Sequence, residues 1–198
     1  MIGLPRIASR AFDAPLLIDP AKAEAIALGL GARILGGAVE FVGGIGPIEH
    51  VAAPELGTVG NFLGRAYAAR NVRPYAQIDS VAIIPVEGTL VHKGGYVGSS
   101  SGETSYEGLQ TQVAAALSAD DVKGVVFEVD SYGGEAAGAF ETADMIAKLS
   151  AAKPTLAILN EVGLSAGYLI ASAARQIVAP EFGRAGSIGV LMMHIDRS

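Results

Sequence analysis

The chain contains no cysteine, which excludes disulfides, thiol nucleophiles and cysteine-based metal sites. Charged residues make up only 17% of its 198 residues, whereas disordered chains combine many charges with few apolar residues. Long apolar runs are also absent. The longest stretch without a charged residue covers the thirteen residues 162–174, and a membrane-spanning helix needs about twenty. The mean hydropathy of +0.42 therefore indicates a buried core.

Basic charge is scarce in most of the chain. Residues 80–198 carry seven basic and thirteen acidic groups, which accounts for the whole net charge of −6, whereas residues 1–79 sum to zero. Phosphate binding needs a basic surface, so the acidic body argues against nucleic acid as a partner. The first residues lack an apolar stretch that ends at a cleavage site, and we therefore expect a cytoplasmic protein.

Two segments near the N-terminus differ in the spacing of their apolar residues and in their glycine and proline content. Residues 20–35 have apolar residues at helical spacing after a start signal at Asp19 and Pro20, whereas residues 36–64 are broken by glycine and proline, which is typical of a loop or linker. We expect residues 1–75 to form a helical and glycine-rich N-terminal arm. This arm either packs on a partner or stays mobile, and the alternative is an extension with no specific role.

Strands and helices are predicted to alternate after residue 75. Pro85 predicts an edge strand or a bulge, and the apolar run at 124–129 is typical of a strand buried on both faces. The alternation implies right-handed βαβ crossovers and an α/β domain with a mainly parallel sheet over residues 76–198. The expected strands are 80–86, 124–129, 154–159, 176–179 and 186–192, and the expected helices are 106–119, 135–149 and 165–174.

Two candidate sites lie where a predicted strand meets a helix. The first is Asp-Ser-Tyr-Gly-Gly at 130–134, where paired glycines leave backbone amides accessible and a helix start would add an anion site. The alternative is a tight turn with no other role. The second is Gly-Leu-Ser-Ala-Gly at 163–167, which has the Gly-x-Ser-x-Gly spacing of a nucleophile elbow. Its alternative is an ordinary serine N-cap.

The two sites are about one βαβ unit apart, so their loops can emerge together at the carboxyl ends of neighbouring strands. One loop would supply the Ser165 hydroxyl and an amide, and the other a second amide of an oxyanion hole, which favours acyl transfer. Ser165 then needs a base. The candidates for this base are His50, His92, His194, Lys93, Lys153 and the pair Glu141 and Asp144. Each of them can also be interpreted as an ordinary surface, packing or solvated residue.

Three segments resemble the signal peptide peptidase A family of serine peptidases: residues 124–134, Leu-Ser-Ala-Gly-Tyr at 164–168 and Gly-Ser-Ile-Gly-Val at 186–190. Within that family the chain is most similar to the phage branch of prohead peptidases, to which residues 4–10 and 88–94 are also similar. The resemblance implies the spiral of βαβ units that the family shares with the Clp protease subunit and the crotonases.

The resemblance also implies roles for individual residues. Ser165 would be the nucleophile, Gly134 and Ala166 would supply the oxyanion amides, and Ser187 would help to hold a catalytic lysine. The neighbouring residues Gly133, Gly186, Ile188 and Gly189 are assigned to substrate binding. No cofactor or metal is implied. The family uses a Ser–Lys dyad, but no lysine follows Lys153 here, so that we expect a chain truncated at its C-terminal end, a base from another chain, or an inactive copy.

The resemblance predicts a serine endopeptidase that processes scaffold and capsid proteins in phage head assembly. It would act in the cytoplasm of the host bacterium, with incorporation into proheads, and as a homo-oligomer without a membrane span. We expect the 198 residues alone to be inactive. The alternatives are an inactive capsid or scaffold component with a peptidase fold, an α/β-hydrolase esterase and a crotonase-type acyl-CoA enzyme. The esterase would need an acid and a histidine well beyond residue 167, and the acyl-CoA enzyme would not need a serine at 165.

Overall fold

The computed structural model describes residues 15–20, 22–23, 40–42 and 59–194. Its core is a sheet in which β4, β7 and β8 lie side by side and parallel. The helix α5 connects β4 to β7, and α6 connects β7 to β8. The predicted α/β class with a mainly parallel sheet is confirmed. The central elements are β4 (Val81–Val91), α5 (Tyr106–Ser118), β7 (Gly124–Glu135), α6 (Ala139–Ala152), β8 (Thr155–Leu164) and α7 (Ala166–Ser172).

Shorter elements surround this centre. β9 and β10 both pair parallel with β8, whereas β3 pairs antiparallel with β4. β1 is antiparallel to both β7 and β11, and β11 pairs antiparallel with β2 on its other side. These elements are β1 (Pro15–Ile18), β2 (Glu40–Val42), α4 (Val59–Ala69), β3 (Ala76–Ile78), β5 (Ser99–Ser100), β6 (Glu103–Ser105), β9 (Gln176–Val178), β10 (Arg184–Gly186) and β11 (Leu191–His194).

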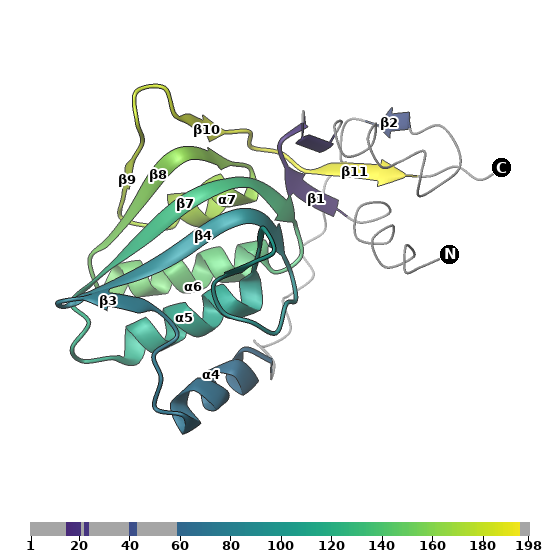
Figure 1. Cartoon of the computed structure of the whole chain (residues 1–198). Helices are drawn as coiled ribbons and strands as arrows, with labels where there is room; N and C mark the ends of the chain where they lie inside the picture. The colour runs from purple at the N-terminus through teal and green to yellow at the C-terminus, as the bar shows by residue number, and fades with distance from the viewer. Residues whose placement is uncertain (1–14, 21, 24–39, 43–58, 195–198) are drawn as a thin grey trace.

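The helices α5, α6 and α7 lie against one face of the sheet (Figure 1). Alternate residues of the strands point toward them and are fully or almost fully buried: Ala82, Ile84 and Val86 from β4, Val125, Phe127 and Val129 from β7, Ala157 and Leu159 from β8. The side chains between them are half-buried or exposed. The prediction that residues 124–129 are buried on both faces is therefore wrong, because the helices of the described residues cover one face and Glu128 on the other face is exposed.

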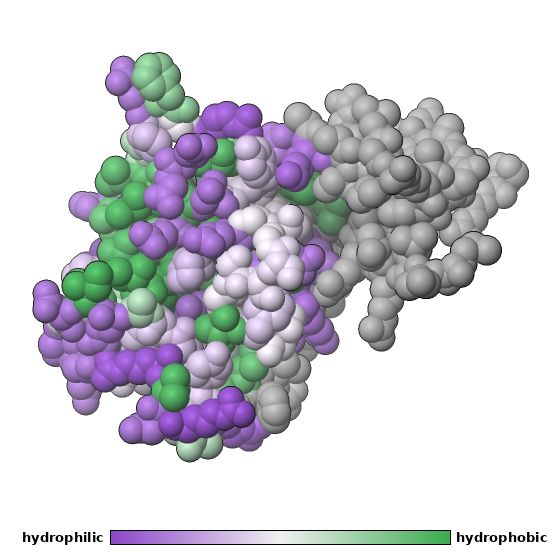
Figure 2. Space-filling model, viewed as in Figure 1, coloured by the Kyte–Doolittle hydropathy of each residue, from purple (hydrophilic) through white to green (hydrophobic). Residues whose placement is uncertain are grey.

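The other sheet face mixes apolar and charged residues. Ile83, Val126 and Leu156 are half-buried there, and Glu128 is exposed. Figure 2 shows hydrophobic residues gathered over the strands among hydrophilic ones. Apolar strand residues that no helix covers are a common feature of association surfaces.

Pro85 lies inside β4 rather than on an edge strand. On one side β4 pairs with β7 throughout, and on the other it pairs with β3 over residues 81–83 and with β6 over residues 89–91. Proline cannot donate to a ladder, and Pro85 falls in the gap between those two partners. The predicted irregularity is present two residues later, where the register with β7 shifts between Glu87 and Thr89.

The N-terminal region differs from its prediction where the structure describes it. The helix α4 begins at Val59, within the segment expected to be a loop, and it packs against α5. Most of the predicted helix at 20–35 and most of the linker lie outside the described residues. Among the residues that are described, no helix is long and apolar enough to cross a bilayer.

Candidate active site

Ser165 lies between the end of β8 and the start of α7, in a backbone conformation that few residues adopt. Its φ of 53° and ψ of −117° belong to a sharp strand-to-helix turn, as expected for a nucleophile elbow. The turn is held from both sides, since Ser165 N donates to Gly186 O (2.8 Å) and Leu169 N donates to Ser165 O (2.9 Å). The residue is 3% exposed.

The two glycines of the Gly-x-Ser-x-Gly motif differ in what a side chain at their positions would meet. A Cβ on Gly163 would lie 2.7 Å from Leu159 Cδ2, and a Cβ on Gly167 would lie 2.9 Å from Ser131 O. Both distances are below ordinary contact. Gly167 therefore lets α7 approach β7 closely, which helps to set the position of Ser165, whereas at Gly163 the clash is with a flexible side chain of the same strand.

Gly133 and Gly134 lie in an extended strand, not in a turn before a helix. β7 continues through them to Glu135, and α6 begins only at Ala139. The predicted anion site at a helix start is therefore wrong. The strand continues because it has partners on both sides: β4 beside Gly133 and Gly134, and β1 on the opposite edge. Gly133 has a φ of 96°, which side chains other than glycine rarely adopt.

Gly133 brings the two motifs into contact. A Cβ placed on it would lie 3.0 Å from Ser165 Cβ and 3.1 Å from Ala166 N. The Ala166 amide therefore faces the same small space beside the Ser165 side chain as the segment Gly133–Gly134 of β7, which is called the glycine strand below. Gly133 N itself donates to Ser131 Oγ (3.1 Å), whereas Gly134 lies in the ladder with β1, opposite Leu17. Gly134 packs against the Leu90 backbone.

The segment from Gly186 to Val190 forms a third wall of the site. Ser165 Oγ donates to Gly189 O over 3.4 Å, a long contact. The predicted strand at 186–192 is wrong in its middle, because β10 ends at Gly186 and β11 begins at Leu191. Gly186 and Ser187 both have positive φ, 113° and 53°, which interrupts the ladder. Ile188 is 86% exposed, so its side chain is available to an incoming chain.

Ser131 was missed as a functional residue by sequence reasoning, although it lies inside the motif at 130–134. It is completely buried. Its Oγ donates to Gly88 O (2.7 Å) and accepts from Gly133 N (3.1 Å), which ties β4 to the glycine strand. A serine two residues before paired glycines, at the end of an apolar strand, was the available signal.

The lysines and histidines that could act as base lie elsewhere or outside the described side chains. Lys153 Nζ donates to Ala116 O and Ala119 O, both at 2.7 Å, at the C-terminal end of α5 and at the far end of β8 from Ser165. His92 packs beside Gly138, and Lys93 is exposed. His194 ends β11 opposite Glu40.

Other candidates can be placed as follows. His50 lies outside the described residues. Glu141 and Asp144 are on α6, where no described contact joins them to Ser165. Within the described part of the chain, Gly189 O is the hydrogen-bond partner of Ser165 Oγ, and no lysine or histidine bonds to it.

Tyr106 supports the glycine strand from the helix layer. It is completely buried, and its hydroxyl donates to Glu135 O (2.8 Å) at the end of β7. Burial raises the pKa of Tyr106 far above its usual range, and the negative charge of Glu135 adds to this. The phenol therefore remains a donor at any ordinary pH.

Two of the cavities in the described region differ in how near they lie to Ser165. One, of about 470 Å³, adjoins the site, because its lining includes Tyr132, next to Gly133, and Val162 and Arg184, which are paired residues of β8 and β10. Two cations lie over the aromatic ring of Tyr132, with Lys22 Nζ and the Arg184 guanidinium each 5.1 Å from its centroid. Such contacts are attractive and hold this wall together.

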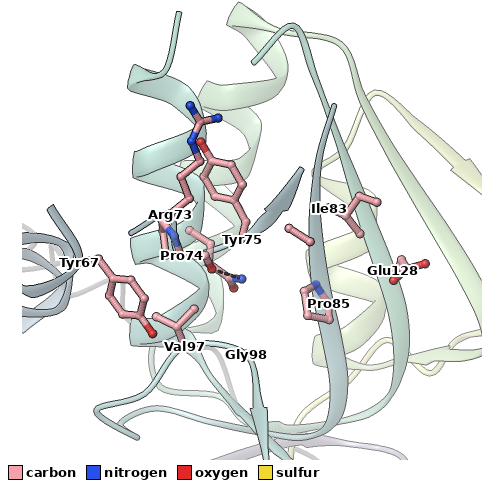
Figure 3. Close-up of a pocket in the computed structure, with 11 residues that line it drawn as sticks. Tyr67, Arg73, Pro74, Tyr75, Ile83, Pro85, Val97, Gly98 and Glu128 are labelled. Carbon is pink, nitrogen blue, oxygen red and sulfur yellow. Dashed lines mark hydrogen bonds between the residues drawn. The ribbon is translucent and has the colours of Figure 1, made fainter. Parts of the chain in front are cut away.

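The other cavity, of about 390 Å³, is lined by Tyr67, Tyr75, Pro85 and Glu128 among others (Figure 3). It contains none of the candidate site residues. Gln112 anchors it, since its Nε2 donates to Pro74 O (2.9 Å). Among the described residues, no group of three or more His, Cys, Asp or Glu side chains could hold a metal ion.

Comparison with known proteins agrees with this arrangement. Residues 147–198, which include Ser165 and Ser187, match peptidase family S49. The chain is 36% identical over 192 residues to the head-tail preconnector protein GP5 of Enterobacteria phage P21, covering 97% of this chain and 38% of that protein. It is also 36% identical to the capsid assembly protease C of Escherichia phage lambda, covering 96% and 43%. The chain thus spans less than half the length of these curated relatives.

More distant similarities follow. The chloroplastic serine protease SPPA of Arabidopsis thaliana is 30% identical over 113 residues, which are 57% of this chain and 17% of that protein. A crystal structure of an enoyl-CoA hydratase/isomerase family member aligns with a TM-score of 0.42 at 21% identity, over 56% of this chain and 47% of that one. The resemblance to signal peptide peptidase A of the phage type is confirmed, and residues 147–198 are similar to peptidase family S49.

Proposed function

We propose that the protein is a serine endopeptidase that cleaves scaffold and capsid proteins during phage head assembly, with Ser165 as nucleophile. The observation that carries the proposal is that Gly133 lies directly against the candidate nucleophile: a Cβ on Gly133 would be 3.0 Å from Ser165 Cβ and 3.1 Å from Ala166 N. The function in the relatives' names supplies the substrate class, since one of them is a capsid assembly protease. The site of action would be the host cytoplasm and the prohead.

The geometry supports acyl transfer as the reaction. Ser165 Oγ would attack the carbonyl carbon of a substrate peptide while a base accepts the hydroxyl proton. The amides of Ala166 and Gly134 would donate to the resulting oxyanion. The amine then leaves with a proton from the base, and water hydrolyses the acyl-enzyme to regenerate Ser165. Ser131 would position the glycine strand by holding Gly133 N.

A lysine base is proposed from the family resemblance, with Ser187 beside it. Ser187 follows Gly186, whose carbonyl accepts from Ser165 N, so its place in the chain suits this role. A desolvated lysine with a lowered pKa can accept the serine proton near neutral pH. Because no lysine follows Lys153, that base would come from outside these residues.

A second candidate function is a non-catalytic component of the head with a peptidase fold. It is favoured by the absence of a lysine or histidine bonded to Ser165 Oγ within the described residues. The two candidates differ in turnover and not in fold, so a variant of the nucleophile distinguishes them.

The experiment compares Ser165→Ala with Ser172→Ala in the full reading frame that encodes the chain, expressed together with the scaffold and capsid proteins. Ser172 is an exposed serine of α7 whose Oγ donates to Leu169 O, so it is a matched control. Loss of a catalytic nucleophile lowers the rate by about 10⁴-fold or more. Gel analysis should show no processing with Ser165→Ala and normal processing with Ser172→Ala. Processing that survives Ser165→Ala would refute the assignment, and no processing by the unmodified protein would favour the non-catalytic candidate.

We also propose that the protein works as a homo-oligomer. The uncovered sheet face with Ile83, Val126 and Leu156 supports this, because those side chains remain partly in contact with water in a single chain.

A further inference from the structure

β1 lies in line with β8, directly beyond the candidate nucleophile. β8 is paired with β7 as far as Gly163, opposite Ser131, and with β10 as far as Leu164, opposite Gly186. At Ser165 the chain turns into α7, which leaves the edge of β7 open. β1 takes this place, antiparallel to β7 on one side and to β11 on the other. Figure 1 shows β1 between the end of β7 and β11.

A backbone carbonyl of β1 reaches the space beside Ser165. A Cβ on Gly133 would collide with Leu17 O, and the same point lies 3.0 Å from Ser165 Cβ and 3.1 Å from Ala166 N. In the register, Leu17 is opposite Gly134. Leu17 O therefore lies near the Ser165 side chain and the Ala166 amide, and its residue is paired with Gly134. This is the region in which a scissile carbonyl has to lie.

The rest of β1 is held as a bound peptide would be. Asp19 N donates to Tyr132 O (3.0 Å), and Ala136 N donates to Pro15 O (3.1 Å), so backbone hydrogen bonds close the pairing with β7 at both ends. Leu16, Leu17 and Ile18 are 6%, 6% and 4% exposed. Peptides that bind by strand addition gain affinity from main-chain bonds and specificity from side-chain pockets.

We propose that β1 occupies the groove that binds the substrate peptide, with the Leu17 carbonyl in the position of the scissile carbonyl, so that the chain blocks its own site. The inference rests on the proposed function, because it takes Ser165 as the nucleophile. It further assigns the class of ligand: an extended peptide with consecutive aliphatic residues, like Pro15–Ile18. A substrate must displace β1 before it can bind.

Self-occlusion lowers the apparent affinity for any peptide. The apparent dissociation constant equals the intrinsic one divided by the fraction of molecules in which the groove is open. A variant that drives β1 out of the groove should therefore bind a peptide more tightly than the unmodified chain does. An aspartate at position 17 has this effect, since a buried unpaired carboxylate is strongly unfavourable.

The experiment measures binding of a fluorescein-labelled nonapeptide with the sequence of residues 14–22 by fluorescence anisotropy. The proteins are the unmodified chain, Leu17→Asp and the matched control Leu63→Asp. Leu63 is a leucine of α4 with nearly the same exposure, 7%, but it has no part in the groove. Leu17→Asp should bind at least about tenfold more tightly than the unmodified chain, since a tenfold change needs only about 1.4 kcal/mol. Leu63→Asp should bind the peptide no more tightly than the unmodified chain does, and none of the three proteins should bind a peptide with the same residues in scrambled order.

Three results would overturn the proposal: equal binding by Leu17→Asp and the unmodified chain, an equal gain in Leu63→Asp, or a gain for the scrambled peptide. A second variant, with residues 15–18 replaced by Gly-Ser-Gly-Ser, removes the aliphatic side chains without introducing a charge and should show the same gain. If both β1 variants lose cooperative unfolding, β1 is a structural strand and the proposal is wrong. Binding involves no chemical step, so these results hold with Ser165→Ala and do not depend on whether the proposed peptidase activity is found.

Discussion

Gly167→Ala tests whether close packing of α7 on β7 positions the candidate nucleophile. The new Cβ would lie 2.9 Å from Ser131 O and 3.0 Å from Ser131 Cβ. Ser131 cannot give way easily, because its Oγ is bonded to Gly88 O and its strand is paired on both sides. The helix α7 must therefore move. Overpacking of this kind costs about 1–3 kcal/mol, and the better helix propensity of alanine returns about 0.5–1 kcal/mol.

The matched control is Gly64→Ala, because Gly64 is also a helical glycine. The nearest atom to a Cβ there is Thr111 Cγ2 at 4.0 Å, so the change should stabilise the protein by about 0.5–1 kcal/mol. Gly167→Ala should destabilise it by about 1 kcal/mol, the difference between the middle values of the two effects, and for a chain of this size each kcal/mol shifts Tm by about 2–4 °C. Thermal unfolding followed by circular dichroism gives both values. Equal or higher Tm for Gly167→Ala than for the unmodified chain would refute the packing argument.

Two further predictions concern pH and association. Burial raises the pKa of Tyr106 in the folded chain, so above the ordinary tyrosine pKa of about 10 the unfolded chain loses this proton more readily than the folded one does. The free energy of unfolding should therefore be unaffected by Tyr106 below that pH and fall above it by about 1.4 kcal/mol per pH unit. In urea unfolding, Tyr106→Phe should lose less stability between pH 9 and 11 than the unmodified chain, and equal losses would contradict the buried phenol. Light scattering at high micromolar concentration should show an oligomer that Val126→Glu, on the uncovered sheet face, weakens, and a monomer throughout would count against self-association.

The order of helices and strands in the main domain could be predicted from periodicity, because each strand places alternate apolar residues under the helices. The ends of strands could not. β7 runs through Gly133 and Gly134 since distant β1 pairs with them, and local propensity carries no information about such a partner. The break at Ser187 depends on a positive φ in a residue other than glycine, which no pattern indicates.

Prediction of the site had the same limits. The pair of motifs at 130–134 and 163–167 could be brought together, because the carboxyl ends of adjacent parallel strands lie side by side. The position of Gly133, against Ser165 and Ala166, required the structure. So did the supporting bonds of Ser131, because a buried serine differs from an exposed one only in its surroundings.

The place of β1 in the sheet has a consequence for the timing of synthesis. β1 leaves the ribosome first, but one of its two partners, β11, begins only at Leu191. At about 5–20 residues per second, roughly ten to thirty seconds separate the two segments during translation. Closing so long a loop is entropically costly, so the β1 ladders can form only after the strands around them exist. β7 is complete at Glu135, so β1 can pair with it long before β11 has been made, and the two ladders of β1 therefore form one after the other.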